Sequence, residues 1–392
     1  MKIAIITAFP PSKVTLNEYG YHLVKNLVQK KEVSEVVLLC DTTEGLKQLD
    51  FENSTKVTIK ECWTFNSYST IASISSVVRE EKPDAVLLNL QFMKFGDQKV
   101  PAALGLLIPM VLRLHKIPTV SLLHNILEQV DLESAGFTDN KIAQNIYNFI
   151  GTCLTRFILK SDVVTVTIQK YVTVLENKYK VKNVKLIPHG TFDTIEEPSF
   201  ELGPGPKQIM AFGKFGTYKK VEILIEAAVL VRERSSDEIE VVIAGTDSPN
   251  TPGYLAMVQE KYKDVPGLRF TGYVEESEVP EIFGSSTVVA FPYTSTTGSS
   301  GVLHQAGSYG KAVVMPDLGD LALLVEEEGY KGEFFNPESA ESLAEALERI
   351  INNDANRKAI AQQNFKAASA LSMDKIAQMY LDTFKQIIRS KA

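Results

Sequence analysis

The sequence predicts an α/β protein built from two doubly wound parallel-sheet domains. Short β-branched runs alternate with longer helical patterns from the first residue onward, as in IAIITAF, a helical stretch over 17–30 and EVVLLC, and this alternation is typical of βαβ units. Runs such as AVLLNL and TVSLLH are apolar on both faces, as expected for strands covered by helices on both sides. The 392 residues exceed the roughly 100–200 that one domain usually holds, so we expect two domains.

The alternation breaks at TFDTIEEPSFELGPGPK, where Pro, Gly and acidic residues oppose both a helix and a central strand. We therefore predict a first domain over 1–195, a linker over 196–206 and a second domain over 207–371. A second βα series in that domain begins with QIMAFG and continues through EVVIAG, TVVAFPY and KAVVMP. The segment 372–392 carries a one-faced apolar stripe, and we expect this helix to return to the first domain.

Composition excludes several classes of protein. A net charge of -7 and a pI near 5.5 argue against nucleic-acid binding, which needs clustered Lys and Arg. Three widely spaced cysteines among apolar residues are typical of reduced core thiols. The N-terminus resembles a first strand more than a signal peptide. The apolar stretch 100–112 is interrupted by two prolines and is shorter than the roughly 20 residues of a membrane span. We expect a cytoplasmic protein.

Ligands of open α/β sheets bind in the loops that follow the strands, and two loops of the second domain are rich in suitable groups. The loop after QIMAFG contains Gly213, Lys214 and Lys219 before a helix. Glycine allows close backbone approach, and lysine charges and a helix N-terminus both attract phosphate. This spacing predicts a diphosphate site. The alternative from the residues alone is a solvated lysine cluster.

The second loop follows VVAFPY and leads into the helix VLHQAGSYG. It contains Thr297, Gly298, Ser299, Ser300 and Gly301. Small residues let backbone N–H groups converge on an anion or on sugar hydroxyls. The alternative is a flexible loop capped by Ser or Thr.

Two histidines also follow predicted strands, His124 in HNILE and His189 in PHGTFD. Lone histidines are more often structural than catalytic, so a structural role and a catalytic role both remain possible interpretations for each of them. The sequence has no GxxxxGK[ST], GxGxxG after a strand, HExxH, GxSxG or CxxC motif. It also has no Asp-x-Asp pair for a metal-bound diphosphate. We therefore expect no metal and no cofactor, with charge neutralised by lysines and helix ends.

Taken together, KLIPHGTFD, GKFGTYKKVEILIEA and GSSGVLHQAGSYGKAVV resemble the donor domain of retaining glycosyltransferases of the GT-B fold, in the family called family 4 or group 1. The resemblance implies two Rossmann-like domains facing a central cleft. It also implies transfer of a sugar from a nucleoside diphosphate to an acceptor hydroxyl on a saccharide, a lipid-linked acceptor or a small molecule.

The resemblance assigns roles to individual residues. Lys214 stands where the family has an arginine, and Lys219 stands at its invariant lysine; both would face the donor phosphates. His124 matches the first-domain histidine that points toward the transferred sugar. Residues from Gly298 to Val302 would give backbone contacts to the sugar and the diphosphate.

The sequence departs from the family's pattern at two places. The family's paired glutamates correspond to Thr297 and Gln305, of which Gln305 could still bind ribose hydroxyls through its amide oxygen. The first loop lacks the family's double glycine, and we expect Lys13 and Asn17 to line the cleft there, with His189 on the same side.

The lost glutamates leave alternatives open. One is a catalytically degenerate subunit that binds or regulates a partner, and another is a nucleotide-sugar epimerase on the same fold. For the active transferase we expect same-face attack, with the leaving phosphate taking the acceptor proton, since no carboxylate nucleophile is evident. The apolar segment 100–114, flanked by cations, is either an interfacial helix that meets a lipid-linked acceptor at the membrane or a helix covering the sheet.

Overall fold

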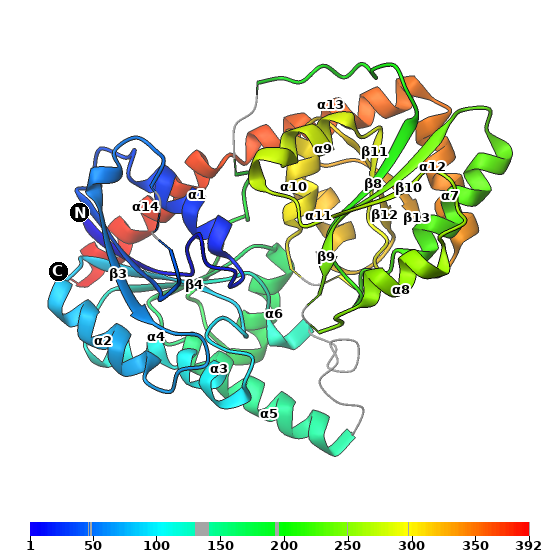
Figure 1. Ribbon diagram of the computed structural model, residues 1–392. Coiled ribbons are helices and arrows are strands. Elements are labelled where there is room, and N and C mark those ends of the chain that lie inside the picture. Colours follow the sequence, from blue (N-terminus) through cyan, green and yellow to red (C-terminus); the bar gives the residue numbers. More distant parts are fainter. Residues whose placement is uncertain are drawn as a thin grey trace. The chain divides into compact units, whose positions relative to one another are not determined.

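A computed structural model describes residues 1–392 except 46, 48, 130–140, 193–195, 249, 297 and 392, and it does not describe the side chains of 129, 142 and 143. The described chain divides into two compact units (Figure 1). The N-terminal unit holds residues 1–129, 141–192 and 372–391, and the C-terminal unit holds residues 196–371.

The N-terminal unit is built on a parallel sheet in the order β3-β2-β1-β4-β5-β6-β7. Its strands are β1 Lys2–Ile6, β2 Glu35–Asp41, β3 Val57–Trp63, β4 Ala85–Leu90, β5 Thr119–Leu123, β6 Val163–Val166 and β7 Val184–Leu186. The central strands β1 and β4 are almost entirely buried, because helices cover both faces of a parallel sheet.

In the described part of this unit, seven α-helices surround the sheet. They are α1 Asn17–Leu27, α2 Thr70–Glu81, α3 Lys99–Gly105, α4 Ile108–Leu114, α5 Lys141–Ile158, α6 Gln169–Tyr179 and α14 Met373–Lys391. The last of these packs on α1, and its apolar stripe, including Ile376, Tyr380 and Phe384, is buried in the core of this unit. Among the described helices, none combines the length and the apolar character needed to span a bilayer.

The apolar segment 100–114 forms two short helices, where the sequence suggested one. α3 ends at Gly105 and α4 begins at Ile108. Pro109 lies in the first turn of α4, where its missing N–H costs nothing, whereas within a continuous helix it would remove a hydrogen bond. Ile108 and Leu112 are fully buried, so α4 covers the sheet.

The C-terminal unit repeats the architecture with a six-stranded parallel sheet in the order β10-β9-β8-β11-β12-β13. Its strands are β8 Lys207–Phe215, β9 Ile239–Asp247, β10 Leu268–Gly272, β11 Val288–Ala290, β12 Ala312–Pro316 and β13 Glu333–Phe335. Its helices are α7 Glu222–Arg234, α8 Tyr254–Lys261, α9 Val279–Ser285, α10 Gly301–Ser308, α11 Gly319–Glu328, α12 Ala340–Ile351 and α13 Asp354–Ala370. The predicted pair of parallel α/β sheets is confirmed.

Strand order fixes where each unit can bind a ligand. In the first sheet β1 lies between β2 and β4, and in the second β8 lies between β9 and β11. At such switch points the loops leaving neighbouring strands diverge and open a crevice at the carboxyl edge. In the C-terminal unit the two diverging loops are those that follow β8 and β11.

Candidate functional site

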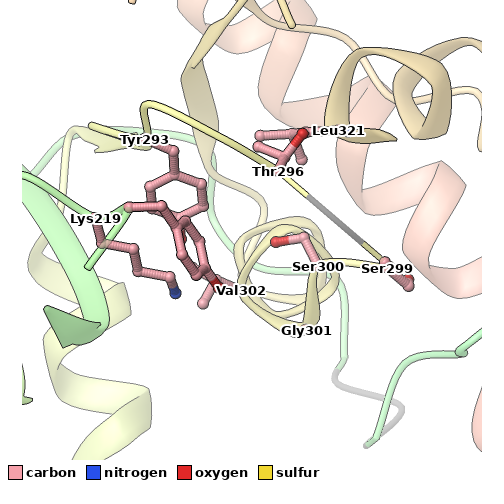
Figure 2. Close-up of a pocket in the computed structure, with 10 residues that line it drawn as sticks. Lys219, Tyr293, Thr296, Ser299, Ser300, Gly301, Val302 and Leu321 are labelled. Carbon is pink, nitrogen blue, oxygen red and sulfur yellow. Dashed lines mark hydrogen bonds between the residues drawn. The ribbon is translucent and has the colours of Figure 1, made fainter. Parts of the chain in front are cut away.

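A pocket of about 100 Å³ lies at the switch point of the C-terminal sheet. One side is formed by the loop after β8, and the other by the loop after β11 and the start of α10 (Figure 2). The lining residues are Tyr218, Lys219, Tyr293, Thr296, Gly298, Ser299, Ser300, Gly301, Val302 and Leu321. Most are small, hydroxylic or aromatic, and Lys219 carries the only charge among these lining residues.

The backbone holds Lys219 in place from both sides. Lys219 forms an isolated antiparallel bridge with Tyr293. On either side of it, the Thr294 N–H donates to the Tyr218 carbonyl at 2.8 Å and the Lys220 N–H donates to the Pro292 carbonyl at 2.9 Å. These bonds join the loop after β8 to the loop after β11. The lysine therefore sits on a short sheet-like ribbon, which fixes the start of its side chain.

The Lys219 side chain runs along the aromatic wall toward the start of α10 (Figure 2). Its Nζ lies 4.6 Å from the centre of the Tyr293 ring and 6.0 Å from that of Tyr218. No carboxylate in the described chain forms an ion pair with it. Burial lowers the pKa of Lys219 from its usual 10.5, and the nearby Tyr218 partly opposes that shift. A desolvated ammonium without a counter-ion favours an incoming anion.

The N-terminus of α10 supplies donors opposite the lysine. Ser300 caps the helix, and its side chain accepts from the Leu303 N–H at 3.3 Å. The first N–H groups of a helix have no partner within the helix, so the amides at Gly301 and Val302 are available to an anion, with the helix dipole in support. The loop before the cap is tied to α11, because the Gly298 N–H donates to Asp320 Oδ2 at 3.1 Å.

A buried polar cluster around His304 contacts the loop after β11 at Ser299. His304 Nε2 lies 3.1 Å from Ser299 Oγ, and His304 Nδ1 lies 2.9 Å from the Tyr330 hydroxyl. The Glu328 carboxylate is 3.6 Å from His304 Nε2, its side chain is 5% exposed and neither oxygen has a hydrogen bond. Burial raises the pKa of Glu328 to about 8. Glu328 is therefore largely neutral at pH 7, and its contact with His304 is not an ion pair between two charges.

Other residues predicted for this site lie outside the pocket lining. Lys214 is exposed and Gln305 is half-buried; neither lines the pocket. Gly213 adopts φ +128°, and a Cβ atom there would stand 3.0 Å from Lys219 Nζ. Glycine at this position thus leaves room for the lysine head group. Thr297 lies outside the described residues.

In the N-terminal unit, His124 lies at the end of β5 and is buried. Asn89 Nδ2 donates to Thr7 Oγ1 at 2.9 Å, so Asn89 Oδ1 accepts from His124 Nε2 at 2.7 Å. Burial, followed by the nearby His189 and Lys94, keeps the pKa of His124 well below its usual value. The imidazole is therefore neutral, with Nδ1 as its unprotonated nitrogen.

His189 is also buried, and its Nδ1 lies 2.9 Å from the Gly190 carbonyl oxygen. Burial lowers the pKa of His189 to about 4. Its ring and that of His124 both pack against Tyr19. The two histidines of the sequence analysis thus form one aromatic cluster in this unit.

Lys13 lies in the loop after β1, and Asn17 is the first residue of α1. Lys13 is exposed, and Asn17 Nδ2 donates to the Ser12 carbonyl at 2.7 Å. The loop is also tied to the body of this unit by the fully buried Lys94, whose Nζ donates to the Thr15 carbonyl at 2.7 Å. Burial lowers the pKa of Lys94 to about 7, with Asp41 opposing the shift. Hydrogen bonds from Asn17 and Lys94 therefore order a loop that lacks a glycine pair.

Sequence reasoning missed several of these groups. Tyr293 ends the run VVAFPY and could have been found as the aromatic residue at a strand end. Glu328 and Leu321 come from α11, and no local pattern in the sequence links them to the loop after β11. In the N-terminal unit, Asn89 was likewise not singled out. Lys94 was expected among the cations that flank the apolar segment 100–114, but it is fully buried and bonds to the loop after β1 instead.

Comparisons with known proteins find sequence similarity in the C-terminal unit. Residues 206–353 match the family model described as glycosyl transferases group 1. A D-inositol 3-phosphate glycosyltransferase from Corynebacterium aurimucosum is 30% identical over 203 residues, which cover 48% of this chain and 47% of that protein. The chain thus matches about half the length of this curated relative.

Solved structures resemble the chain over its full length. A sucrose-phosphate synthase from Thermosynechococcus elongatus has a TM-score of 0.73 at 14% identity, with all of both chains covered. The chain has the fold of the GT-B glycosyltransferases. The Anabaena protein HepE, solved with UDP-glucose, has a TM-score of 0.68 at 16% identity and covers 98% of this chain and 100% of its own. At these identities the likeness establishes the fold.

Proposed function

We propose that this GT-B chain is a metal-independent retaining glycosyltransferase. In this proposal it moves a sugar from a nucleoside diphosphate to an acceptor hydroxyl, and it acts in the cytoplasm. The observation that carries the proposal is the position of Lys219, a desolvated ammonium that faces the N-terminus of α10 across a small pocket. A diphosphate satisfies both the lysine and the unpaired amides of that helix.

The same groups would stabilise the transition state. As the glycosidic bond breaks, negative charge grows on the diphosphate, and fixed donors aimed at that charge lower the barrier. Lys219 and the amides from Ser299 to Val302 would supply such donors, and Lys214 would add a further positive charge, whereas the Gly298 N–H already donates to Asp320 and this residue would contact the sugar through its other backbone atoms. Gln305 would bind ribose hydroxyls at the edge of the site.

We further propose same-face attack of the acceptor. The described residues that line the pocket include no carboxylate, which a covalent glycosyl-enzyme would need as its nucleophile. The departing phosphate oxygen would take the acceptor proton, so the acceptor oxygen forms the new bond as the old one breaks. Closure of the active site around the donor would limit hydrolysis by water.

The acceptor is proposed to bind the N-terminal unit. His124, with a neutral imidazole held by Asn89, is suited to accept a hydrogen bond from a sugar hydroxyl through Nδ1. Lys13, Asn17 and His189 are the other candidates in this unit. The acceptor class is a saccharide, a glycolipid or a small molecule with a free hydroxyl.

The known proteins support a nucleotide sugar as the donor. The D-inositol 3-phosphate glycosyltransferase matches a region that includes about half of this chain, and HepE was solved with UDP, with UDP-glucose, and with UDP and glucose. UDP-hexoses are therefore the first donors to test.

Release of nucleoside diphosphate from a panel of sugar nucleotides tests the proposal. We expect Lys219→Ala to lower kcat at least about a hundredfold, since one preorganised donor usually contributes a few kcal/mol to the barrier. Lys220→Ala is the matched control, because Lys220 is an exposed neighbour outside the pocket lining. Equal turnover in the two variants would remove Lys219 from the mechanism.

The two competing functions give different results in the same assay. A degenerate binding subunit would bind a sugar nucleotide without releasing nucleoside diphosphate, whatever acceptor is added. An epimerase would convert one sugar nucleotide into another in the absence of an acceptor. Chromatography of the nucleotides therefore separates all three.

A further inference from the structure

Two segments of the N-terminal unit contain no acidic residue. Residues 99–118 and 141–160 hold six Lys or Arg and no Asp or Glu, in a chain with 41 basic and 48 acidic residues. The first segment contains α3 and α4, and the second contains α5. α4 packs against α5, so the two segments form one region of the unit, and its charge is opposite to that of the chain as a whole.

The helix α5 presents an exposed apolar face in this region. Ile146 is 53% exposed, Phe149 is 70% exposed and Ile150 is 42% exposed. Their spacing of three and four residues places them on one side of the helix. A different side, marked by the buried Gly151 and Thr155, faces the protein, and Leu127 packs at Gly151. The helix therefore has one apolar side in the core and a second apolar side in water.

Cations surround this exposed face. Lys141, Arg156 and Lys160 are exposed along and just beyond α5. Lys99 of α3 contacts Tyr147 of α5, with its Nζ 4.5 Å from the ring centre, and Arg113 of α4 donates to the Lys160 carbonyl at 3.1 Å.

Among the residues that the structure describes, the acidic residues next to these segments are Asp97 and Asp162. Both are engaged elsewhere, since Asp97 accepts from Asn66 and Asp162 pairs with Lys391. Within the described part of the chain no carboxylate pairs with Lys141, Arg156 or Lys160, so these cations can contact an outside partner.

We propose that α5 and its surrounding bases form a docking surface for an anionic lipid bilayer. Ile146, Phe149 and Ile150 would enter the interface between head groups and acyl chains, and the bases would contact lipid phosphates. A helix with an apolar face flanked by Lys and Arg binds in the plane of such an interface, and each base near an anionic surface adds further attraction. This inference is independent of the proposed transferase activity.

A bilayer matches this surface better than a nucleic acid does. A nucleic acid would contact the Lys and Arg side chains but would leave Ile146, Phe149 and Ile150 in water, where their exposure is unfavourable. A bilayer interface contacts the cationic side chains through its head groups and the apolar side chains through its acyl region. Such a surface also carries a consequence for function, since it would bring the N-terminal unit to an acceptor held in the membrane.

Flotation of the full chain with phosphatidylcholine vesicles, with and without 30% phosphatidylglycerol, tests the proposal. We expect the wild type to float with anionic vesicles and at least tenfold less with neutral ones. Phe149→Glu should lower flotation at least tenfold, and Arg156→Glu should also lower it. Tyr68→Glu is the matched control, because Tyr68 is 65% exposed in the same unit and lies outside this surface. Circular dichroism verifies the fold of each variant, and Phe149→Leu should keep binding.

Three results would overturn the proposal. The first is a wild type that does not float with anionic vesicles. The second is flotation that survives both Phe149→Glu and Ile146→Glu but is lost in Arg156→Glu, since this would be charge attraction without insertion. The third is a concentration-dependent dimer in sedimentation that Phe149→Glu abolishes while vesicles are ignored, because the partner of the face would then be a second copy of the chain.

Discussion

Glu328 offers a prediction that depends only on burial and protonation. Its carboxyl group is 5% exposed, has no hydrogen bond on either oxygen and has a pKa raised to about 8. We expect Glu328→Gln to stabilise the C-terminal unit at neutral pH. Glutamine keeps the shape of the side chain, and it removes a group whose charged form the folded state disfavours.

The size and sign of the effect follow from the shift. The folded state binds the Glu328 proton more tightly than the unfolded state does. The free energy of unfolding of the wild type therefore falls as the pH rises from 4.5, the usual pKa of the group, toward about 8, its pKa in the folded state. Each pH unit in that window corresponds to at most about 1.4 kcal/mol. At pH 7 the gain for glutamine is then up to ~3 kcal/mol, and near pH 4.5 it approaches zero.

Urea unfolding followed by circular dichroism between pH 5 and pH 8 measures this difference. The single tryptophan, Trp63, lies in the N-terminal unit, so its fluorescence identifies the transition that does not belong to Glu328. The reasoning would be refuted by a stability difference that stays constant over this pH range, or by a variant that is less stable throughout.

Three further predictions concern the site and its supports. Gly213→Ala places a Cβ 3.0 Å from Lys219 Nζ on a backbone with φ +128°. Donor affinity should fall about tenfold or more, and the backbone strain should lower the free energy of unfolding by roughly 1–3 kcal/mol. An unchanged donor Kd in calorimetric titration would contradict this. Lys94→Met should abolish the rise in stability that the wild type shows from about pH 7 upward, measured by Trp63 fluorescence; identical pH profiles would refute it. His304→Leu should raise KM for the donor more than it lowers kcat, because His304 positions Ser299; an effect on kcat alone would count against that role.

Local sequence patterns were enough to predict the fold class. Alternating strands and helices follow from short-range periodicity, and doubly apolar runs such as AVLLNL are buried in β4 as expected. Asn353 is a local signal for the start of α13, because its side chain accepts from the Asn356 N–H and caps that helix. The break between α3 and α4 within 100–114 has a local cause in Pro109, because proline is favoured in the first turn of a helix and not in its interior. The single helix expected there overlooked this residue.

The site was only partly readable from the sequence. Glycines, lysines and serines after strand ends are local signals, and the structure brings Lys219 together with Gly298, Ser299, Ser300, Gly301 and Val302. The contacts that order the loops are not local in sequence. Glu328 lies against His304 across 24 residues in the C-terminal unit, and Lys94 bonds to Thr15 across 79 residues in the N-terminal unit. Such contacts depend on packing that periodicity does not encode.

The most direct test of the account is a crystal structure of the protein soaked with the nucleoside diphosphate that its best donor releases. The account predicts the two phosphates between Lys219 Nζ and the first amides of α10, in contact with the Gly301 and Val302 N–H groups. Density for the nucleotide elsewhere, with this pocket empty or closed by Tyr218 and Tyr293, would contradict it.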